Sequence, residues 1–517
     1  MTLSVAVPRE RREHERRVAL VPQFVPKLAA RGARVRVETG CARAAGFHDE
    51  AWVGAELAPD FDATVAGADV VLKVAPPTPQ EARRLPPGSL LVCLMAPTRH
   101  LEVVEALVER GVTVLAMDLV PTLTRARSMN AVSSQATVAG YKAALLAAEL
   151  SPRLFPMLTT AAGTVRPANV VVIGAGVAGL QAIATVRRLG ARVEAYDIRR
   201  SARERIESLG ARAIETGVVA ETGDGTARTL RAPEAVRQRE VLSERLAKAH
   251  AVICAASIPH RDAPKIIDAG MVEGMLPDTV IVDLASESGG NCELTRPGQQ
   301  YWHGDVFISG PVNLPSHGTV HASEMYARNL VNFLELVLVD GAVRLDPGDE
   351  IVARTVLVHA GEVHHLPTAG LLGRPAAPFG EPVRSGPRGA APAETEEEDA
   401  AAGWARPEPA PEPPPPEATA RAPVGGDEGV GPPADRSDEP DDDPADDFTQ
   451  IDGVGPALAT RLRGFGYRRF AEIADLDDAG LERLAVQLEL DDEAIAGDWR
   501  GQARRLAAGS TVREAGA

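Results

Sequence analysis

Short apolar runs alternate with amphipathic stretches along residues 1–370. Runs rich in valine and leucine have the length of buried strands, and helical periodicity lies between them, as at 21–30 and 101–110. The first five runs lie at 3–8, 34–40, 69–74, 89–95 and 112–118. Regular alternation of strand and helix predicts a parallel sheet covered by helices.

A second array of the same kind begins at Asn169. Its runs lie at 170–176, 191–197, 211–215, 251–256, 279–285 and 306–310. We predict connecting helices at 133–150 and 321–338, and a return of the chain to the first array at 342–366. The fold class is therefore α/β, with two doubly wound Rossmann-like domains formed by 1–132 with 339–372 and by 133–338.

The composition changes after the second array. Residues 380–447 hold 19 acidic residues, 5 basic residues and 15 prolines, which accounts for most of the net charge of −17. Such a stretch has too few apolar residues to offset the entropy of ordering, and its charges repel one another. We predict a disordered linker at 373–447.

The last segment, 448–517, is predicted to be a small all-α domain. The stretch IDGVGPALA at 451–459 resembles a helix-hairpin-helix motif, whose glycine turn grips a DNA phosphate in many proteins. The segment is acidic, however, and follows Asp441, Asp442 and Asp443, whereas affinity for nucleic acid comes largely from neutralising phosphate charge. We expect a protein-interacting module, with nucleic-acid binding as the alternative.

Several classes of protein are not expected from this sequence. The N-terminus has a dense charge cluster and not a secretory signal, and no apolar run has the length of a membrane helix, so we expect a cytoplasmic protein. The histidines show no metal-ligand spacing, and we expect no metal. The cysteines form no C-x-x-C pair and are expected to be reduced and buried: Cys41, Cys93, Cys254 and Cys292.

A dinucleotide fingerprint opens the second array. Gly174, Gly176 and Gly179 form G-x-G-x-x-G directly after a strand, and Asp197 stands at the end of the next strand. Missing Cβ atoms let the backbone approach a pyrophosphate at a helix N-terminus. An acid at this position accepts hydrogen bonds from ribose hydroxyls and repels a 2′-phosphate, so we predict NAD(H). Arg199 beside it keeps NADP(H) open.

Beyond the fingerprint, the order of several motifs resembles one known family. These motifs include RARSMNAVSSQATVAGYKA, VVIGAGVAGLQAI, SIPHRDAPKII, IVDLASESGGNCE and SGPVNLPSHGTVHASEMYARNLVNFL. Residues 1–370 resemble the soluble NAD(H)-binding alpha subunit of proton-translocating NAD(P) transhydrogenase, a family related to alanine dehydrogenase. The resemblance implies hydride transfer from NADH to NADP(H) held on a partner subunit. Further cofactor-binding residues are predicted at Val177, Ala178, Ile198, Arg199, Gly225, Gln238 and Ser257.

The chain departs from the family in the loop after the last core strand of the first domain. The family reads approximately P-R-x-S-R-A-Q-S-M-D, whereas Thr122, Arg127 and Asn130 stand here for its arginine, glutamine and aspartate. In the family these positions align the two nicotinamides. Ser133, another nicotinamide-side residue, is present. We predict that Arg127, Asn130 and Ser133 flank hydride transfer with rearranged contacts. Thr226 replaces the tyrosine of a flap over the nucleotide.

Two other functions stay open. An alanine-like dehydrogenase would use Arg17 and Lys73, with Glu287 as a stand-in acid, but the histidine that such relatives place two strands on is missing from SLLVCLMAP. An NAD-responsive adaptor would use the C-terminal segment to bind nucleic acid or protein.

The resemblance also implies partners. The chain would need membrane-embedded subunits for the NADP site and the proton channel, which would hold it peripherally at the inner face of the cell membrane. The family is a homodimer. We expect the apolar stretch 326–339 and the helix after Ser133 to offer the dimer surface.

Overall fold

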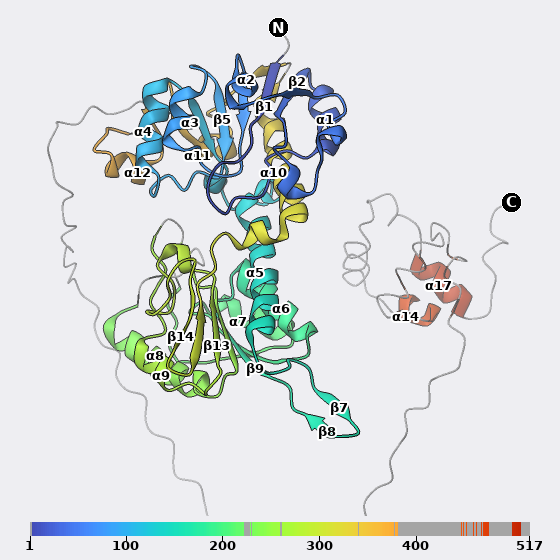
Figure 1. Cartoon of the computed structure of the whole chain (residues 1–517). Coiled ribbons are helices and arrows are strands. Elements are labelled where there is room, and N and C mark those ends of the chain that lie inside the picture. The colour runs from blue at the N-terminus through green and yellow to red at the C-terminus, as the bar shows by residue number, and fades with distance from the viewer. Residues whose placement is uncertain are drawn as a thin grey trace, which may run out of the picture. The chain divides into compact units, whose positions relative to one another are not determined.

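The computed structural model describes two units of the chain, residues 1–396 and 397–517. In the first unit the described residues are 3–221, 228, 230–258, 261–339, 341–376 and 378–380. In the second they are 446, 448, 451, 459, 462, 467, 469–474 and 499–507. Figure 1 shows two sheet domains in the first unit, joined by long helices.

The first domain is built on an eight-stranded sheet. Its strands are β1 (Leu3–Val7), β2 (Ala33–Glu38), β3 (Glu56–Ala58), β4 (Val70–Leu72), β5 (Leu90–Cys93), β6 (Thr113–Ala116), β18 (Val356–His359) and β19 (Glu362–Val363). The order is β19-β18-β6-β5-β4-β1-β2-β3, and all pairs from β3 to β6 are parallel. Strand β18 joins the edge antiparallel to β6. The return of the chain to this sheet therefore closes one edge of it.

Helices cover both faces of this sheet. They are α1 (Val25–Ala29), α2 (Phe61–Val65), α3 (Pro79–Arg84), α4 (Leu101–Arg110), α11 (Glu350–Thr355) and α12 (Leu366–Leu371). The side chain of Asp60 caps α2, and Thr78 with Glu81 forms a capping box on α3. The expected helix over 21–30 is not continuous. It is a 3₁₀ turn at Pro22–Phe24 followed by α1, because two prolines interrupt the backbone hydrogen bonds.

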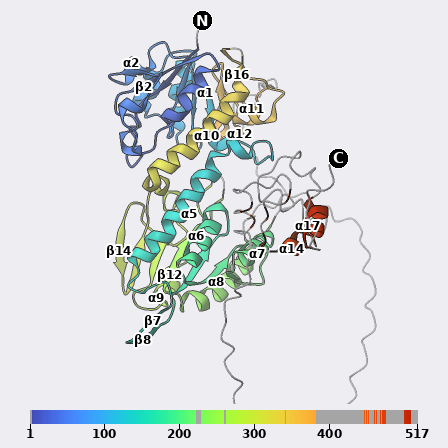
Figure 2. The same cartoon turned by 90° about the vertical axis from the view of Figure 1, so that its right-hand side faces the viewer.

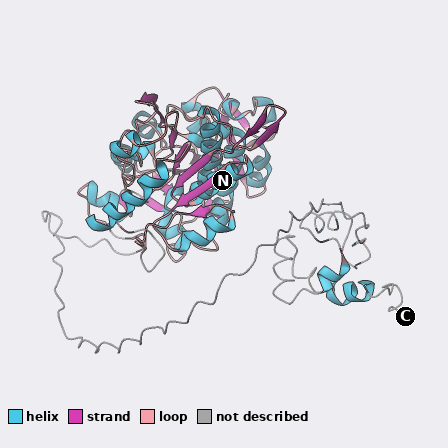
Figure 3. Ribbon diagram, turned by 90° about the horizontal axis from the view of Figure 1, so that it is seen from below, coloured by secondary structure: helices cyan, strands magenta, loops and turns pink. Residues whose placement is uncertain are grey.

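The second domain has a seven-stranded sheet. Its strands are β9 (Asn169–Ile173), β10 (Arg192–Tyr196), β11 (Arg212–Ala213), β12 (Ala251–Cys254), β13 (Val280–Asp283), β14 (Gln300–His303) and β15 (Val306–Ser309). The order is β11-β10-β9-β12-β13-β15-β14, and of these strands only β14 runs antiparallel to its neighbour. The helices are α6 (Val177–Arg188), α7 (Ser201–Ser208), α8 (Ala232–Leu246) and α9 (Ala269–Glu273). The prediction of two Rossmann-like domains is confirmed, and Figure 3 shows helices on both sides of the strands.

Two long helices, α5 (Ala131–Leu150) and α10 (Thr319–Val337), run between the domains (Figure 2). Helix α5 packs against α6 at Gly140, where an added Cβ atom would lie 2.0 Å from the carbonyl oxygen of Ala178. Only glycine permits two helix backbones to approach so closely. Of the described helices, none is long and apolar enough to cross a membrane.

The expected dimer surface at 326–339 is wrong. The apolar residues of α10, including Tyr326, Leu330, Phe333 and Leu334, are buried in the core of the first domain. Exposed apolar side chains lie instead on and beside a hairpin of β7 (Leu158–Thr160) and β8 (Gly163–Val165), which protrudes from the second domain (Figure 1). Periodicity detects an apolar helix face but does not show which part of the same chain covers it.

The described residues of the second unit include α14 (Phe470–Ala474) and α17 (Trp499–Ala507). Phe448, Ile451, Leu462, Phe470 and Ile473 form a small apolar cluster there. Most of the predicted glycine motif, and most of the predicted linker, lie outside the described residues.

Candidate nucleotide site

The glycine turn between β9 and α6 has the geometry that the fingerprint predicts. Gly174 has φ +93°, and a Cβ atom on it would lie 2.6 Å from the backbone nitrogen of Ala256. A Cβ atom on Gly179 would lie 1.8 Å from the carbonyl oxygen of Gly174. By contrast, nothing lies within 4 Å of the corresponding position on Gly176. Two glycines thus allow close packing, while the third leaves open space in front of the N-terminus of α6, where a pyrophosphate fits.

This turn lies at the point where the strand order reverses. Strands β10 and β11 lie on one side of β9, and β12 to β15 lie on the other. Open α/β sheets bind ligands in the crevice outside the carboxyl ends of strands at such a point. The position of the turn therefore supports a dinucleotide site by topology as well as by sequence.

Asp197 follows β10 and turns its carboxylate toward the glycine turn. One oxygen, Oδ2, accepts a hydrogen bond from the Ala175 N–H at 2.7 Å and one from Nη2 of Arg199 at 3.0 Å. The other, Oδ1, accepts from the N–H and Nε of Arg199 at 2.9 and 3.0 Å. Burial alone would raise the pKa of this carboxyl, but the hydrogen bonds and charge of Arg199 lower it below its usual range. Asp197 is therefore ionised and already paired.

The other predicted cofactor-binding residues lie around the same crevice but differ in accessibility. Val177 is exposed at the first position of α6, and Ser257 is exposed after β12. Ala178 contacts Gly140, and Ile198 packs partly into the core. Gln238 is buried, and its Nε2 donates to the Tyr196 hydroxyl at 2.8 Å. It therefore supports the strand end beside Asp197. Gly225 and Thr226 lie outside the described residues.

The divergent loop leads into α5 through Asn130. The Oδ1 atom of Asn130 accepts a hydrogen bond from the Ser133 N–H at 2.8 Å, so Asn130 is the N-cap of α5. Thr122 and Arg127 are exposed. A hollow of about 610 Å³ is lined by Thr122, Asn130 and Ser133 together with residues of α11, α12 and the segments beside them. The structure therefore brings three of the four loop positions to one surface.

Contacts outside the divergent positions hold this loop. Arg125 makes two hydrogen bonds to Asp349, at 2.9 and 2.7 Å. Asn329 of α10 donates to the Ser128 carbonyl oxygen at 2.7 Å, and Ala126 and Met129 are buried. The backbone of the loop is thus fixed independently of Thr122 and Arg127.

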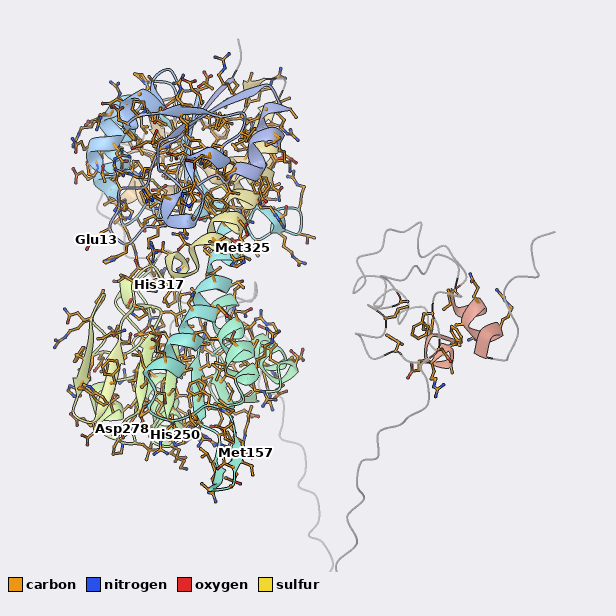
Figure 4. The ribbon with its side chains drawn as sticks, turned by 45° about the vertical axis from the view of Figure 1, so that its right-hand side comes forward. Glu13, Met157, His250, Asp278, His317 and Met325 are labelled. Atoms are coloured by element: carbon orange, nitrogen blue, oxygen red, sulfur yellow. The ribbon has the colours of Figure 1, made fainter. Side chains whose placement is uncertain are left out.

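The two domains contact each other next to the crevice. Glu15 accepts hydrogen bonds from Ser316 and Asn313 of the second domain at 2.8 and 3.1 Å. Burial would raise the pKa of Glu15, but hydrogen bonds and the charge of Arg17 lower it to about 2. Arg99 donates to the carbonyl oxygen of Glu287 at 3.0 Å. Figure 4 labels Glu13 and His317, which lie at the facing edges of the two domains.

The crevice of the first domain holds an ionic cluster that sequence reasoning missed. Lys73, after β4, is fully buried, with its Nζ 3.1 Å from Glu10 and 3.4 Å from Glu81. Glu38, at the end of β2, accepts from the Arg9 N–H and pairs with Arg11 at 2.7 Å. Burial would lower the pKa of Lys73, but the two glutamates raise it. Only the spatial pairing of β1 with β4 brings these residues together, so no local pattern could have revealed them.

Other reactive groups add no second site within the described residues. The four cysteines are buried and free, as predicted, and burial raises the pKa of Cys93 and Cys254 well above the usual value. No group of three or more potential ligands that could hold a metal ion occurs in the part of the chain that the structure describes.

Comparison with known proteins decides the family. The profiles of the N- and C-terminal domains of "Alanine dehydrogenase/PNT" match residues 6–139 and 143–366. The chain is 40% identical over 382 residues to the first of the two chains named as the NAD(P) transhydrogenase alpha subunit in Rhodospirillum rubrum, and the match covers 71% of this chain and 99% of the relative. The chain belongs to the NAD(P) transhydrogenase alpha-subunit family.

The solved structures agree with this family. A transhydrogenase from Sinorhizobium meliloti superposes with a TM-score of 0.62 at 38% identity, covering 70% of this chain and 99% of that one. Similarity to alanine dehydrogenase is lower, with 30% identity to the Bacillus subtilis protein over 56% of this chain. The predicted resemblance to the transhydrogenase alpha subunit is confirmed. Residues 448–507 match the "RS2/RL21/YNQ2 HHH domain" profile, which agrees with the predicted helix-hairpin-helix module.

Proposed function

We propose that this chain is the NAD(H)-binding subunit of a proton-translocating NAD(P) transhydrogenase. The observation that carries the proposal is the glycine turn at the reversal point of the second sheet, in a chain that matches transhydrogenase alpha subunits over most of its folded part. NADH would supply the hydride, and NADP(H) on a partner subunit would receive it. The domain boundaries 1–132 with 339–372, 133–338, 373–447 and 448–517 belong to this proposal.

The residues of this chain would bind and orient the nucleotide. The N-terminus of α6, with Gly174, Gly176 and Gly179, would hold the pyrophosphate, and Asp197 would face the adenosine ribose. Asn130, Ser133 and Arg127 would flank the nicotinamide. Hydride transfer needs two rings in near-attack contact with water excluded, and it requires no side-chain acid or base. The absence of the family residues at 122, 127 and 130 is therefore compatible with activity.

The contacts of Arg17 and Lys73 argue against the dehydrogenase alternative. Arg17 is held by Glu15 at 2.6 Å and donates to Gln135 at 2.8 Å, while Lys73 lies between Glu10 and Glu81. The carboxylate of Glu287 accepts the Asn313 N–H at 3.0 Å. A carboxylate substrate would have to displace these acids from both cations, which is costly for buried pairs.

Hydrogen-isotope transfer tests the proposal. The chain is mixed with an NADP-binding transhydrogenase subunit and NADH deuterated at C4, and we expect deuterium to appear in the NADP analogue without exchange with water. Restoring Thr122→Arg, Arg127→Gln and Asn130→Asp together should change the rate only modestly, because the loop backbone is held by other contacts. Oxidation of NADH by an oxo acid, with no transfer to NADP, would overturn the proposal in favour of a dehydrogenase.

Partner subunits in the membrane form a further element of the same proposal. They would carry the NADP site and the proton channel and would hold this chain at the cytoplasmic face of the cell membrane. The C-terminal module would bind protein, since the acidic charge of residues 373–517 opposes nucleic acid. Copurification with membranes that contain the partner subunits, and its loss without them, would test the placement.

The chain would act as a homodimer through the β7–β8 hairpin. Every residue of both strands is exposed, and apolar side chains cluster there with exposed fractions of 52% for Leu154, 63% for Met157, 41% for Leu158 and 44% for Val165. An isolated two-stranded hairpin is marginally stable in water, so a second copy packed on it explains its form. Figure 4 labels Met157 at the base of this hairpin.

We expect Leu158→Asp with Val165→Asp to convert a dimer into a monomer in light scattering. Val53→Asp, at another exposed apolar position, should leave the dimer intact. A dimer that survives the double substitution would exclude the hairpin as the interface.

A further inference from the structure

The acid that faces the adenosine ribose is already neutralised in this chain. A carboxylate has about four acceptor positions, and Asp197 uses them for the Ala175 N–H and three donors of Arg199. The Arg199 side chain supplies two of these bonds and a full positive charge. An acid paired in this way repels a 2′-phosphate less than a free acid would. Discrimination between NAD(H) and NADP(H) therefore needs a second source.

A donor set suited to a phosphate follows Asp197 directly. Helix α7 begins at Ser201, and the N–H groups of Arg200 and Ser201 and the Ser201 hydroxyl meet at its N-terminus. Backbone N–H groups and a hydroxyl at a helix N-terminus make an anion site. In a Rossmann fold this position comes after the strand that ends in the ribose acid, so it lies where a 2′-phosphate would project.

Glu221 already occupies this donor set. Its Oε2 accepts from the Arg200 N–H at 3.0 Å and from the Ser201 N–H at 3.4 Å, and its Oε1 accepts from the Ser201 hydroxyl at 2.5 Å. A hydrogen bond from the Ala220 N–H to the Ile198 carbonyl oxygen at 3.2 Å holds the segment in place. The charge of Glu221 also acts on Arg199, which therefore interacts with acids on both sides.

We propose that Glu221 is the residue that excludes NADP(H) from this site. Its carboxylate takes the hydrogen bonds that a 2′-phosphate would make, and its charge opposes the phosphate. Arg199 neutralises Asp197 and so leaves the exclusion to Glu221. This inference rests on the proposed binding of NAD(H) in the second domain, but it concerns nucleotide selection and not hydride transfer.

The test uses the full chain and two mononucleotides, AMP and adenosine 2′,5′-bisphosphate, in calorimetric titrations. We expect Glu221→Ala to raise the affinity for the bisphosphate relative to AMP by at least tenfold, because the freed donors then bind the added phosphate. Glu221→Gln should give a smaller gain, because the amide removes the charge but still fills the position. Glu215→Ala is the matched control, since Glu215 is an exposed acid nearby that pairs with Arg203 at 2.6 Å.

A second substitution separates this effect from a change in folding. Ser201→Ala in the Glu221→Ala background should remove most of the gained preference, because the phosphate then loses the hydroxyl donor. An unchanged affinity ratio in Glu221→Ala, with a large change in Asp197→Ala, would overturn the inference and assign the selection to Asp197. A wild-type chain that binds neither AMP nor NADH would overturn the proposed function as well, whereas failure of hydride transfer alone would leave this inference standing.

Discussion

The two sheets of the first unit have the same core strand order but different crevices. In the first domain the order is β3-β2-β1-β4-β5-β6, and in the second it is β11-β10-β9-β12-β13-β15. Each has an acid at the end of its second strand that accepts an N–H from the turn after the first strand: Glu38 from Arg9, and Asp197 from Ala175. The parallel extends down to individual hydrogen bonds.

The turn after the first strand makes the difference. In the second domain it reads GAGVAG, and Gly176 leaves open space at the N-terminus of α6. In the first domain it reads PRERRE, and the long side chains of Glu10 and Arg11 fill the crevice with ion pairs to Lys73 and Glu38. The same topology therefore either offers room for a nucleotide or closes on itself, depending on whether glycine or charged residues follow the first strand.

Removing the buried cation should have the largest effect. Lys73→Met leaves Glu10 and Glu81 without their buried partner, and we expect a loss of about 3–5 kcal/mol in the free energy of unfolding. Burial already raises the pKa of Glu10, so protonation of the acids should relieve the strain, and the deficit should be smaller at pH 5 than at pH 8. Urea denaturation at both pH values measures this.

Lys27→Met is the surface control for that experiment. Lys27 pairs with Glu335 at 2.9 Å in a partly exposed position, and its loss should cost less than about 1 kcal/mol. NADH affinity should be unaffected by either lysine substitution, because we place the nucleotide in the crevice of the second domain. A weaker affinity for NADH in Lys73→Met alone would contradict the contrast between the two crevices.

Two glycine substitutions should separate packing from binding in the second crevice. Gly179→Ala drives a Cβ atom against the Gly174 carbonyl oxygen, and we expect a loss of about 1–3 kcal/mol in stability together with NADH binding. Gly176→Ala meets no neighbouring atom and should keep the thermal midpoint. It should still weaken NADH binding at least tenfold, because the added methyl group intrudes where the pyrophosphate approaches. Equal thermal losses in the two variants would show that Gly176 also serves packing.

The smallest expected effect concerns the divergent loop. Asn130→Ala removes the N-cap of α5 and should cost about 1 kcal/mol, while Asn130→Asp restores a cap and should lose nothing. Thermal denaturation of both variants measures the difference. An equal loss in the two would mean that Asn130 supports the loop through its amide nitrogen and not as a cap.

Local signals in the sequence predicted much of this fold and site. The glycine turn and Asp197 belong to one strand–turn–helix–strand unit, and their roles follow from the chemistry of that unit. The Lys73 cluster and the contact of Glu221 with α7 could not be predicted, because each depends on strands or loops that meet only in the folded chain. Strands β7 and β8 were missed because LTTAAGTV has no apolar alternation, and β18 because its pairing with β6 is nonlocal.

The close contact at Gly140 has a consequence for how this site can evolve. Since α5 and α6 touch backbone to backbone, neither helix can slide or rotate along the other without a clash. From Asn130 to Gly140 the helix rises about 15 Å, so a stiff rod carries the start of α5 at a set distance from the glycine turn. The position of the loop is thus inherited from the rod and not from its own surface side chains. Exposed positions such as Thr122 and Arg127 can then accumulate substitutions while the spacing of the site persists.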